Sequence, residues 1–209
     1  MRKRPNEMKT NIIECAKALF LDNGYTSTTL DSVAKDAGIT KRTLYGYFDS
    51  KGTLLKEVIE ELVGVPWVFA FSVDNIQHEE DLYYILYNIA KGINEVFSNI
   101  EYVKLIRICI TEVNAHPEIN EMLDSGINRQ SLALVTHVLS IANENGIVPI
   151  TNPEFRAQSF VGGLLLEFYS TGLLAPTQVK LNKYTHSQLM AYVADCMPIV
   201  VKNLQEYTA

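Results

Sequence analysis

The segment 30–48 constrains the fold most strongly, because it contains two short helical patterns that are separated by only three residues. Gly38 permits a positive φ between the two patterns, and Thr40 is a suitable N-cap for the second. The second pattern, 41–48, places Leu44 and Phe48 on one face. The first repeats apolar residues at i, i+3, i+4 and i+7, namely Leu30, Val33, Ala34 and Ala37. Two short helices joined by a turn that contains glycine are typical of a helix-turn-helix.

The second of these helices has a predicted outward face that is polar and basic near its start. A helix enters the major groove of DNA with such a face, where Lys and Arg donate to guanine and hydroxyl groups reach bases or phosphates. A lysine that begins the following helix would lie over the DNA backbone. For the two tyrosines, packing in the small core is the alternative. The predicted DNA-binding residues are Thr29, Thr40, Lys41, Arg42, Thr43, Tyr45, Tyr47 and Lys51.

Charge is distributed unevenly along the chain, whose formal net charge is −6. Residues 1–51 contain nine Lys or Arg and six Asp or Glu, a net of +3. Residues 52–209 contain nine and eighteen, a net of −9. A basic end beside an acidic body suits a protein that contacts phosphates with one end only. We therefore predict a helix-turn-helix DNA-binding domain over 1–51 and a helical regulatory and dimerisation domain over 52–209.

The remaining chain is also predicted to be helical, because no strand pattern competes with its helical periodicity. The fold class is therefore all-α. Two late segments, 154–174 and 185–207, are more apolar than a one-sided surface helix requires, so we predict that a homodimer forms through them. The other apolar patterns predict helices over 11–23, 54–62, 82–97, 102–113 and 119–145.

The ordered spacing of the N-terminal motif resembles the TetR family of regulators over about the first quarter of the chain. The matching residues are Thr28-Thr29, Val33-Ala34, Ala37-Gly38-Ile39-Thr40, Thr43-Leu44-Tyr45, Tyr47-Phe48 and Ser50-Lys51. The resemblance implies a homodimer, a roughly palindromic operator, and a C-terminal domain whose ligand alters the spacing of the two DNA-reading heads. Gly52 stands where the family often has an acidic residue. A helical hairpin inside an ordinary bundle is the alternative for 29–48.

Aromatic and acidic residues in the second part of the chain are candidates for ligand binding. Trp67, Phe71 and Tyr87 belong to aromatic clusters that suit an apolar cavity, although ordinary core packing is the alternative. Glu112 and Glu167 are carboxylates in apolar surroundings, where burial requires a partner. One of them could face the cavity and recognise a cationic or hydrogen-bonding ligand. The alternative is a structural ion pair or an exposed helix face.

Enzymatic function has little support in the sequence. The chain has no nucleophile elbow, phosphate loop, metal-ligand cluster or acid-base pair, so we predict no catalytic residue, metal or cofactor. Apolar runs are too short to span a membrane, which favours a cytoplasmic protein. The leading hypothesis is a ligand-responsive transcriptional regulator, more often a repressor. The alternatives are a DNA-binding or partner-binding regulator without an inducer and, less favoured, a helical small-molecule enzyme.

Overall fold

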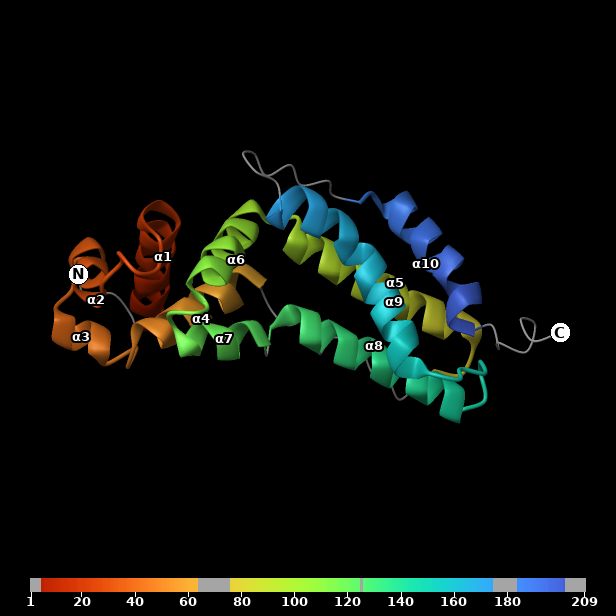
Figure 1. Cartoon of the computed structure of the whole chain (residues 1–209). Coiled ribbons are helices and arrows are strands. Elements are labelled where there is room, and N and C mark those ends of the chain that lie inside the picture. Colours follow the sequence, from red (N-terminus) through yellow and green to blue (C-terminus); the bar gives the residue numbers. More distant parts are fainter. Residues whose placement is uncertain (1–4, 64–75, 125, 175–183, 202–209) are drawn as a thin grey trace. The chain divides into compact units, whose positions relative to one another are not determined.

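The computed structural model describes residues 5–63, 76–124, 126–174 and 184–201, and the regular elements within these ranges are all helices (Figure 1). The predicted all-α class is confirmed. The contacts divide the chain into two compact units. The first contains residues 1–65 and 100–124, and the second contains 66–99 and 125–209. Each unit therefore combines segments that are distant in sequence.

The first unit is built around a single apolar core that six described helices share. They are α1 (Pro5–Asn23), α2 (Leu30–Asp36), α3 (Lys41–Tyr45), α4 (Lys51–Val63), α6 (Ile100–Glu112) and α7 (Pro117–Asp124). Phe20, Leu44 and Phe48 are almost completely buried in this core, as are Leu105 and Cys109 from α6. Helix α2 packs on α1 and α3, and α1 in turn packs on α4 and α6. The division predicted at residues 51 and 52 concerns function and stays a prediction.

Local capping fixes the limits of the short helices. The Thr29 side chain accepts a hydrogen bond from the Ser32 amide and caps α2. The Ser32 hydroxyl accepts one from the Thr29 amide, which completes a capping box. Gly38 adopts φ +68° in the turn that follows, and Thr40 caps α3 by accepting from the Thr43 amide. The third helix was predicted to extend to residue 48, but α3 ends at Tyr45 because the chain turns at Gly46, whose amide bonds the Arg42 and Thr43 carbonyls.

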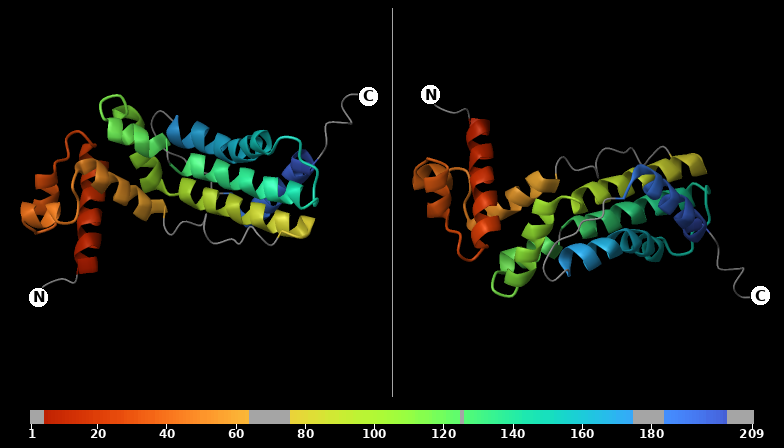
Figure 2. Two further views of the ribbon diagram at one scale, coloured as in Figure 1. Left: turned by 90° about the horizontal axis from the view of Figure 1, so that it is seen from below. Right: turned by 90° about the horizontal axis from the view of Figure 1, so that it is seen from above.

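The second unit contains longer helices that lie along one another. Its described elements are α5 (Glu79–Phe97), α8 (Ile127–Glu144), α9 (Pro153–Phe168), a π-helical turn η3 (Tyr169–Leu173) and α10 (His186–Val201). Helices α8 and α9 pack most extensively, and α5 contacts α8, α9 and α10 (Figure 2). The single helix predicted over 119–145 is wrong: α7 and α8 are separate, and Gly126 is the N-cap of α8.

Two further properties bear on function. Within the described ranges no helix is long and apolar enough to cross a membrane, and no cluster of His, Cys, Asp or Glu could hold a metal ion. The cysteines Cys15, Cys109 and Cys196 are free thiols. Burial raises the pKa of Cys109 to about 12, which keeps this thiol protonated and poorly reactive at neutral pH.

Candidate DNA-binding surface

The start of α3 presents a continuous polar and basic surface to solvent. Thr40 is the N-cap, and Lys41, Arg42 and Thr43 form the first turn; all four side chains are exposed. Tyr45, the last residue of the helix, is 44% exposed. Leu44 faces the opposite way and is completely buried, which fixes the rotation of this short helix. The structure therefore brings five of the predicted residues together on one outward face.

The two cations of this face differ in their surroundings. The Lys41 ammonium lies 2.7 Å and 3.0 Å from the two carboxylate oxygens of Asp31 on α2, and this hydrogen-bonded pairing raises the pKa of Lys41. Both side chains are exposed, so the pair adds little stability and can exchange for a phosphate. Arg42 is exposed and forms no ion pair with any described residue. It is thus the cation most available for a base edge.

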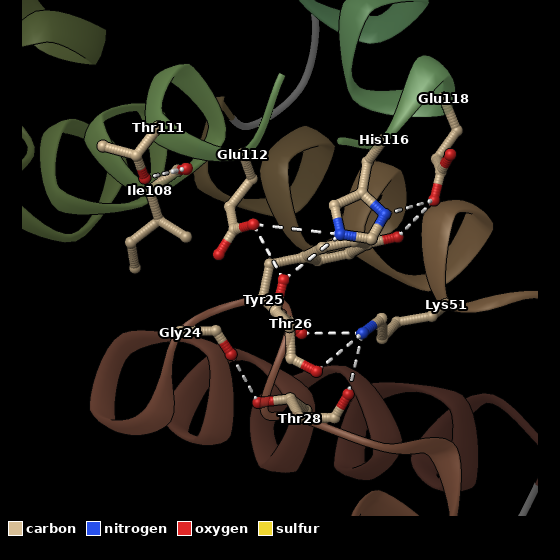
Figure 3. Close-up of polar contacts among 10 residues, drawn as sticks. All are labelled: Gly24, Tyr25, Thr26, Thr28, Lys51, Ile108, Thr111, Glu112, His116 and Glu118. Carbon is tan, nitrogen blue, oxygen red and sulfur yellow. Dashed lines mark hydrogen bonds and ion pairs between the residues drawn. The ribbon is translucent and has the colours of Figure 1, made fainter. Parts of the chain in front are cut away.

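The other three predicted DNA-binding residues have structural contacts of their own. The Thr29 hydroxyl is engaged in the α2 capping box, although its side chain is exposed. Tyr47 is half-buried and packs against the core of the first unit, as the packing alternative foresaw. Lys51 begins α4, and its ammonium group points toward backbone carbonyls that follow α1 (Figure 3). Whether these three touch DNA stays a prediction.

Lys51 holds the loop between α1 and α2, which we define as the Tyr25–Thr28 loop. Lys51 Nζ donates to the carbonyl oxygens of Tyr25 at 2.7 Å, Thr28 at 3.0 Å and Thr26 at 3.4 Å. The same nitrogen lies 4.2 Å from the centroid of the Tyr25 ring, a cation–π arrangement. Burial lowers the pKa of Lys51, and the carboxylates of Glu112 and Glu118 oppose that effect.

The other side of the loop contacts three residues that we call the α6–α7 corner: Glu112, His116 and Glu118. The Tyr25 hydroxyl donates to Glu118 at 2.9 Å, and the Thr26 hydroxyl donates to Glu112 at 2.7 Å (Figure 3). The His116 ring packs edge-on against Tyr25, with its Nε2 3.2 Å from the Thr26 hydroxyl. Burial and the bond to Glu118 raise the pKa of Tyr25. The sequence pattern did not predict these contacts, because the loop and the α6–α7 corner lie about 90 residues apart in the sequence.

The three predicted ligand-binding residues that the structure describes, Tyr87, Glu112 and Glu167, do not come together. A small cavity of about 20 Å³ in the second unit has room for about one water molecule, and of the described predicted residues Glu167 alone lines it. Glu112 lies in the α6–α7 corner of the first unit. Tyr87 is bonded to His186 and does not line the cavity, while Trp67 and Phe71 lie outside the described residues. The cavity is lined by Ile93, Asn94, Phe97, Ser98, Leu164, Glu167, Phe168, Thr171 and Tyr184.

Two family models match this chain. Residues 12–58 match the model described as bacterial regulatory proteins, tetR family, and residues 85–197 match the C-terminal domain of AefR-like transcriptional repressors. A curated relative is the biofilm operon icaADBC HTH-type negative transcriptional regulator IcaR of Staphylococcus aureus. It is 43% identical over 53 residues, which are 25% of this chain and 28% of the relative. The matched part thus spans well under two thirds of that relative.

Solved structures resemble the whole chain in fold. The flavonoid-responsive regulator FrrA superposes with a TM-score of 0.71 at 22% identity, covering 93% of this chain and 95% of its own. SmeT, solved as a triclosan complex, gives a TM-score of 0.70 at 19% identity over 94% and 93% of the two chains. At this level of identity the likeness shows the fold alone. It extends over both compact units.

Proposed function

Because the chain belongs to the TetR family of DNA-binding transcriptional regulators, we propose that it is a repressor that binds a palindromic operator as a homodimer and is released by a small organic molecule. The exposed face of α3, with Arg42 unpaired among the described residues and Lys41 held only by a surface carboxylate, is the observation that carries the DNA-binding part. In functional terms, residues 1–51 supply the DNA contacts and 52–209 supply regulation and dimerisation.

Replacing Arg42 by alanine tests the proposed base contact. We expect specific operator affinity to fall by about 1–3 kcal/mol per half-site, because a bidentate contact to guanine is lost, with a much smaller loss on random DNA. A mobility shift on the upstream region of the protein's own gene, beside a random duplex, measures both. Lys56→Ala is the control, since Lys56 is exposed on α4 and pairs only weakly, at 3.8 Å, with Glu60. Equal losses on both duplexes for Arg42→Ala would contradict the assignment.

The exposed side of α9 supports the proposed homodimer through 154–174. Phe155 and Leu166 are large exposed apolar side chains eleven residues apart on α9, which is three helical turns and places them on one face, and Leu174 after η3 is also exposed. Between them lies Gly162, where an added Cβ would meet open space. Apolar residues interspersed with small ones allow two helices to approach closely, as in the packed cores of homodimer interfaces. The proposed contribution of 185–207 rests on α10, whose described exposed residues include Met190.

The cavity beside Glu167 supports the proposed ligand site. Phe97 and Phe168 meet there with ring centroids 4.3 Å apart, and the Asn94 amide forms two hydrogen bonds with the backbone of Tyr184. Aromatic rings beside a carboxylate form a suitable environment for an organic cation. With room for about one water, the cavity has to enlarge by separation of α5 and α9 before a larger molecule can enter.

We expect a lipophilic cation to release the operator, and Glu167→Gln to weaken that response about tenfold or more, since the charge that attracts the cation is removed. Tetraphenylphosphonium is the probe, and tetraphenylborate, of similar shape and opposite charge, is its control. Both are titrated into mobility shifts with wild type and variant. An equal response to both ions, or an unchanged response in Glu167→Gln, would contradict the role of this carboxylate.

The small volume of the cavity favours a second candidate, a DNA-binding regulator without a small-molecule inducer. The same family membership and the same α3 face support it. The two candidates differ in one respect: the second predicts operator binding that no small organic molecule relieves.

A further inference from the structure

We propose that Lys51 and the α6–α7 corner are positioning residues for DNA binding, which hold the Tyr25–Thr28 loop and through it set the placement of α2 and α3. This inference rests on DNA being bound by α3. It assigns Lys51 a role other than the phosphate contact that its sequence position predicts. It also gives Glu112, His116 and Glu118 a part in operator affinity although none of them belongs to the α3 face.

The surroundings of the Lys51 ammonium show that it holds the Tyr25–Thr28 loop. An ammonium group has three hydrogens, and three backbone carbonyls of the loop lie within hydrogen-bonding distance of Lys51 Nζ. The Tyr25 ring covers the same cation. A phosphate could bind this ammonium only if carbonyl bonds were given up, which would leave loop oxygens without their donor. The side chain is therefore already committed to holding the loop.

The α6–α7 corner carries the second step. The side-chain hydroxyls of Tyr25 and Thr26, at the start of the loop, both donate hydrogen bonds to carboxylates of this corner. Hydrogen bonds to charged acceptors are stronger than those between neutral groups, so they fix the loop from the side opposite Lys51. His116 fills the space between, with Nε2 3.8 Å from Glu112 and Nδ1 3.6 Å from Glu118.

Gly52 supplies an independent observation. A Cβ at this position would lie 2.7 Å from Cγ of Glu118, closer than real Cβ atoms approach. Any larger residue would push the Glu118 side chain away from its bond with Tyr25. Glycine at position 52 therefore leaves room for the Glu118 side chain beside the loop.

The loop is connected directly to the DNA-reading helices. The buried Thr28 hydroxyl shares its one hydrogen between the carbonyls of Gly24 at 2.8 Å and Leu19 of α1 at 3.0 Å, which anchors the end of the loop beside α1. Thr29 follows and caps α2, and α2 packs directly on α3. Displacement of the loop would therefore move α2, and α3 with it.

Salt dependence separates positioning from phosphate contact. We expect Lys51→Met to lower operator affinity of the full-length protein at least about tenfold, with an unchanged slope of log K against log salt concentration. A lost phosphate contact would instead reduce the steepness by about 0.9 for each Lys51 that contacts DNA, and that result would overturn the proposal. Lys56→Met, which removes an exposed charge from the same helix, is the matched control. If wild type and this control bind no operator, the proposed function fails, not the positioning role.

Variants on the other side of the loop give a test that does not depend on Lys51. Tyr25→Phe and Thr26→Val remove hydroxyl donors without changing charge, and we expect each to lower affinity severalfold with an unchanged slope. Glu118→Ala removes a negative charge, which by electrostatics alone would tighten DNA binding; we expect weaker binding. Faster amide hydrogen exchange over 24–30 should accompany each loss. Affinity that stays unchanged in all three variants, or rises in Glu118→Ala, would overturn the proposal.

Discussion

Leu166→Glu is expected to convert the protein to a monomer and to lower operator affinity at least about 100-fold. Leu166 is 66% exposed on the apolar side of α9, the proposed dimer surface. A glutamate there would have to lose its hydration on association without a partner. Once the two DNA-reading heads are separate, each half-site is bound independently, and the gain from linked binding, of order 10² to 10⁴, is lost. Sedimentation velocity and mobility shift measure the two effects.

Tyr84→Glu is the matched control for this variant. Tyr84 is 62% exposed on α5 in the same unit, so it introduces the same charge at an equally exposed helical position outside the proposed interface. We expect it to remain dimeric and to bind the operator as wild type does. A dimeric Leu166→Glu protein would rule out α9 as the interface and would leave α10 as the proposed dimer contact.

Phe20→Ala is expected to lower the free energy of unfolding of the first unit by about 3–5 kcal/mol, the usual cost of truncating a buried aromatic side chain. Phe20 is completely buried, and its ring centroid lies 5.6 Å from that of Tyr25. The cavity would therefore open directly beneath the Tyr25–Thr28 loop, and DNA binding should be lost with the fold. Urea unfolding followed by circular dichroism measures the change.

Tyr45→Ala provides the comparison for Phe20→Ala within the same unit. Its side chain is exposed at the end of α3, so we expect a stability change within about 0.5 kcal/mol. Operator affinity should fall nonetheless if its hydroxyl contacts DNA. Similar unfolding midpoints for the two variants would mean that Phe20 is not part of the core as described.

Local sequence signals predicted the helix-turn-helix well. Capping by Thr40 and the positive φ of Gly38 depend on neighbours a few residues away, and both are confirmed, as is the placement of Leu44 and Phe48 on one buried face. The length of α3 was missed because residues 46 and 47 form a turn, with amides that bond carbonyls three residues back, although the spacing of Leu44 and Phe48 continues the helical pattern. Helical spacing alone does not contain that information.

Contacts between distant segments could not be predicted from local patterns. The partners of Glu112 and Lys51 lie in the Tyr25–Thr28 loop, and no periodicity links positions 25 and 118. Lys51 was predicted to face DNA because a basic residue after the motif has a ready electrostatic explanation. The structure shows that the same charge also satisfies three backbone carbonyls. Apolar surroundings in the sequence likewise misrepresented Glu112, whose neighbours in space are polar.

The discontinuous composition of the first unit has a consequence for biosynthesis. When α4 leaves the ribosome, the core that Leu54 and Val58 join is incomplete, because its members on α6 and α7, which begin at Ile100 and Pro117, are not yet synthesised. The nascent polypeptide therefore exposes apolar side chains of α4 to solvent while roughly fifty further residues are translated. Chaperone capture during this interval would protect the immature protein, and premature termination before residue 100 would leave an aggregation-prone product.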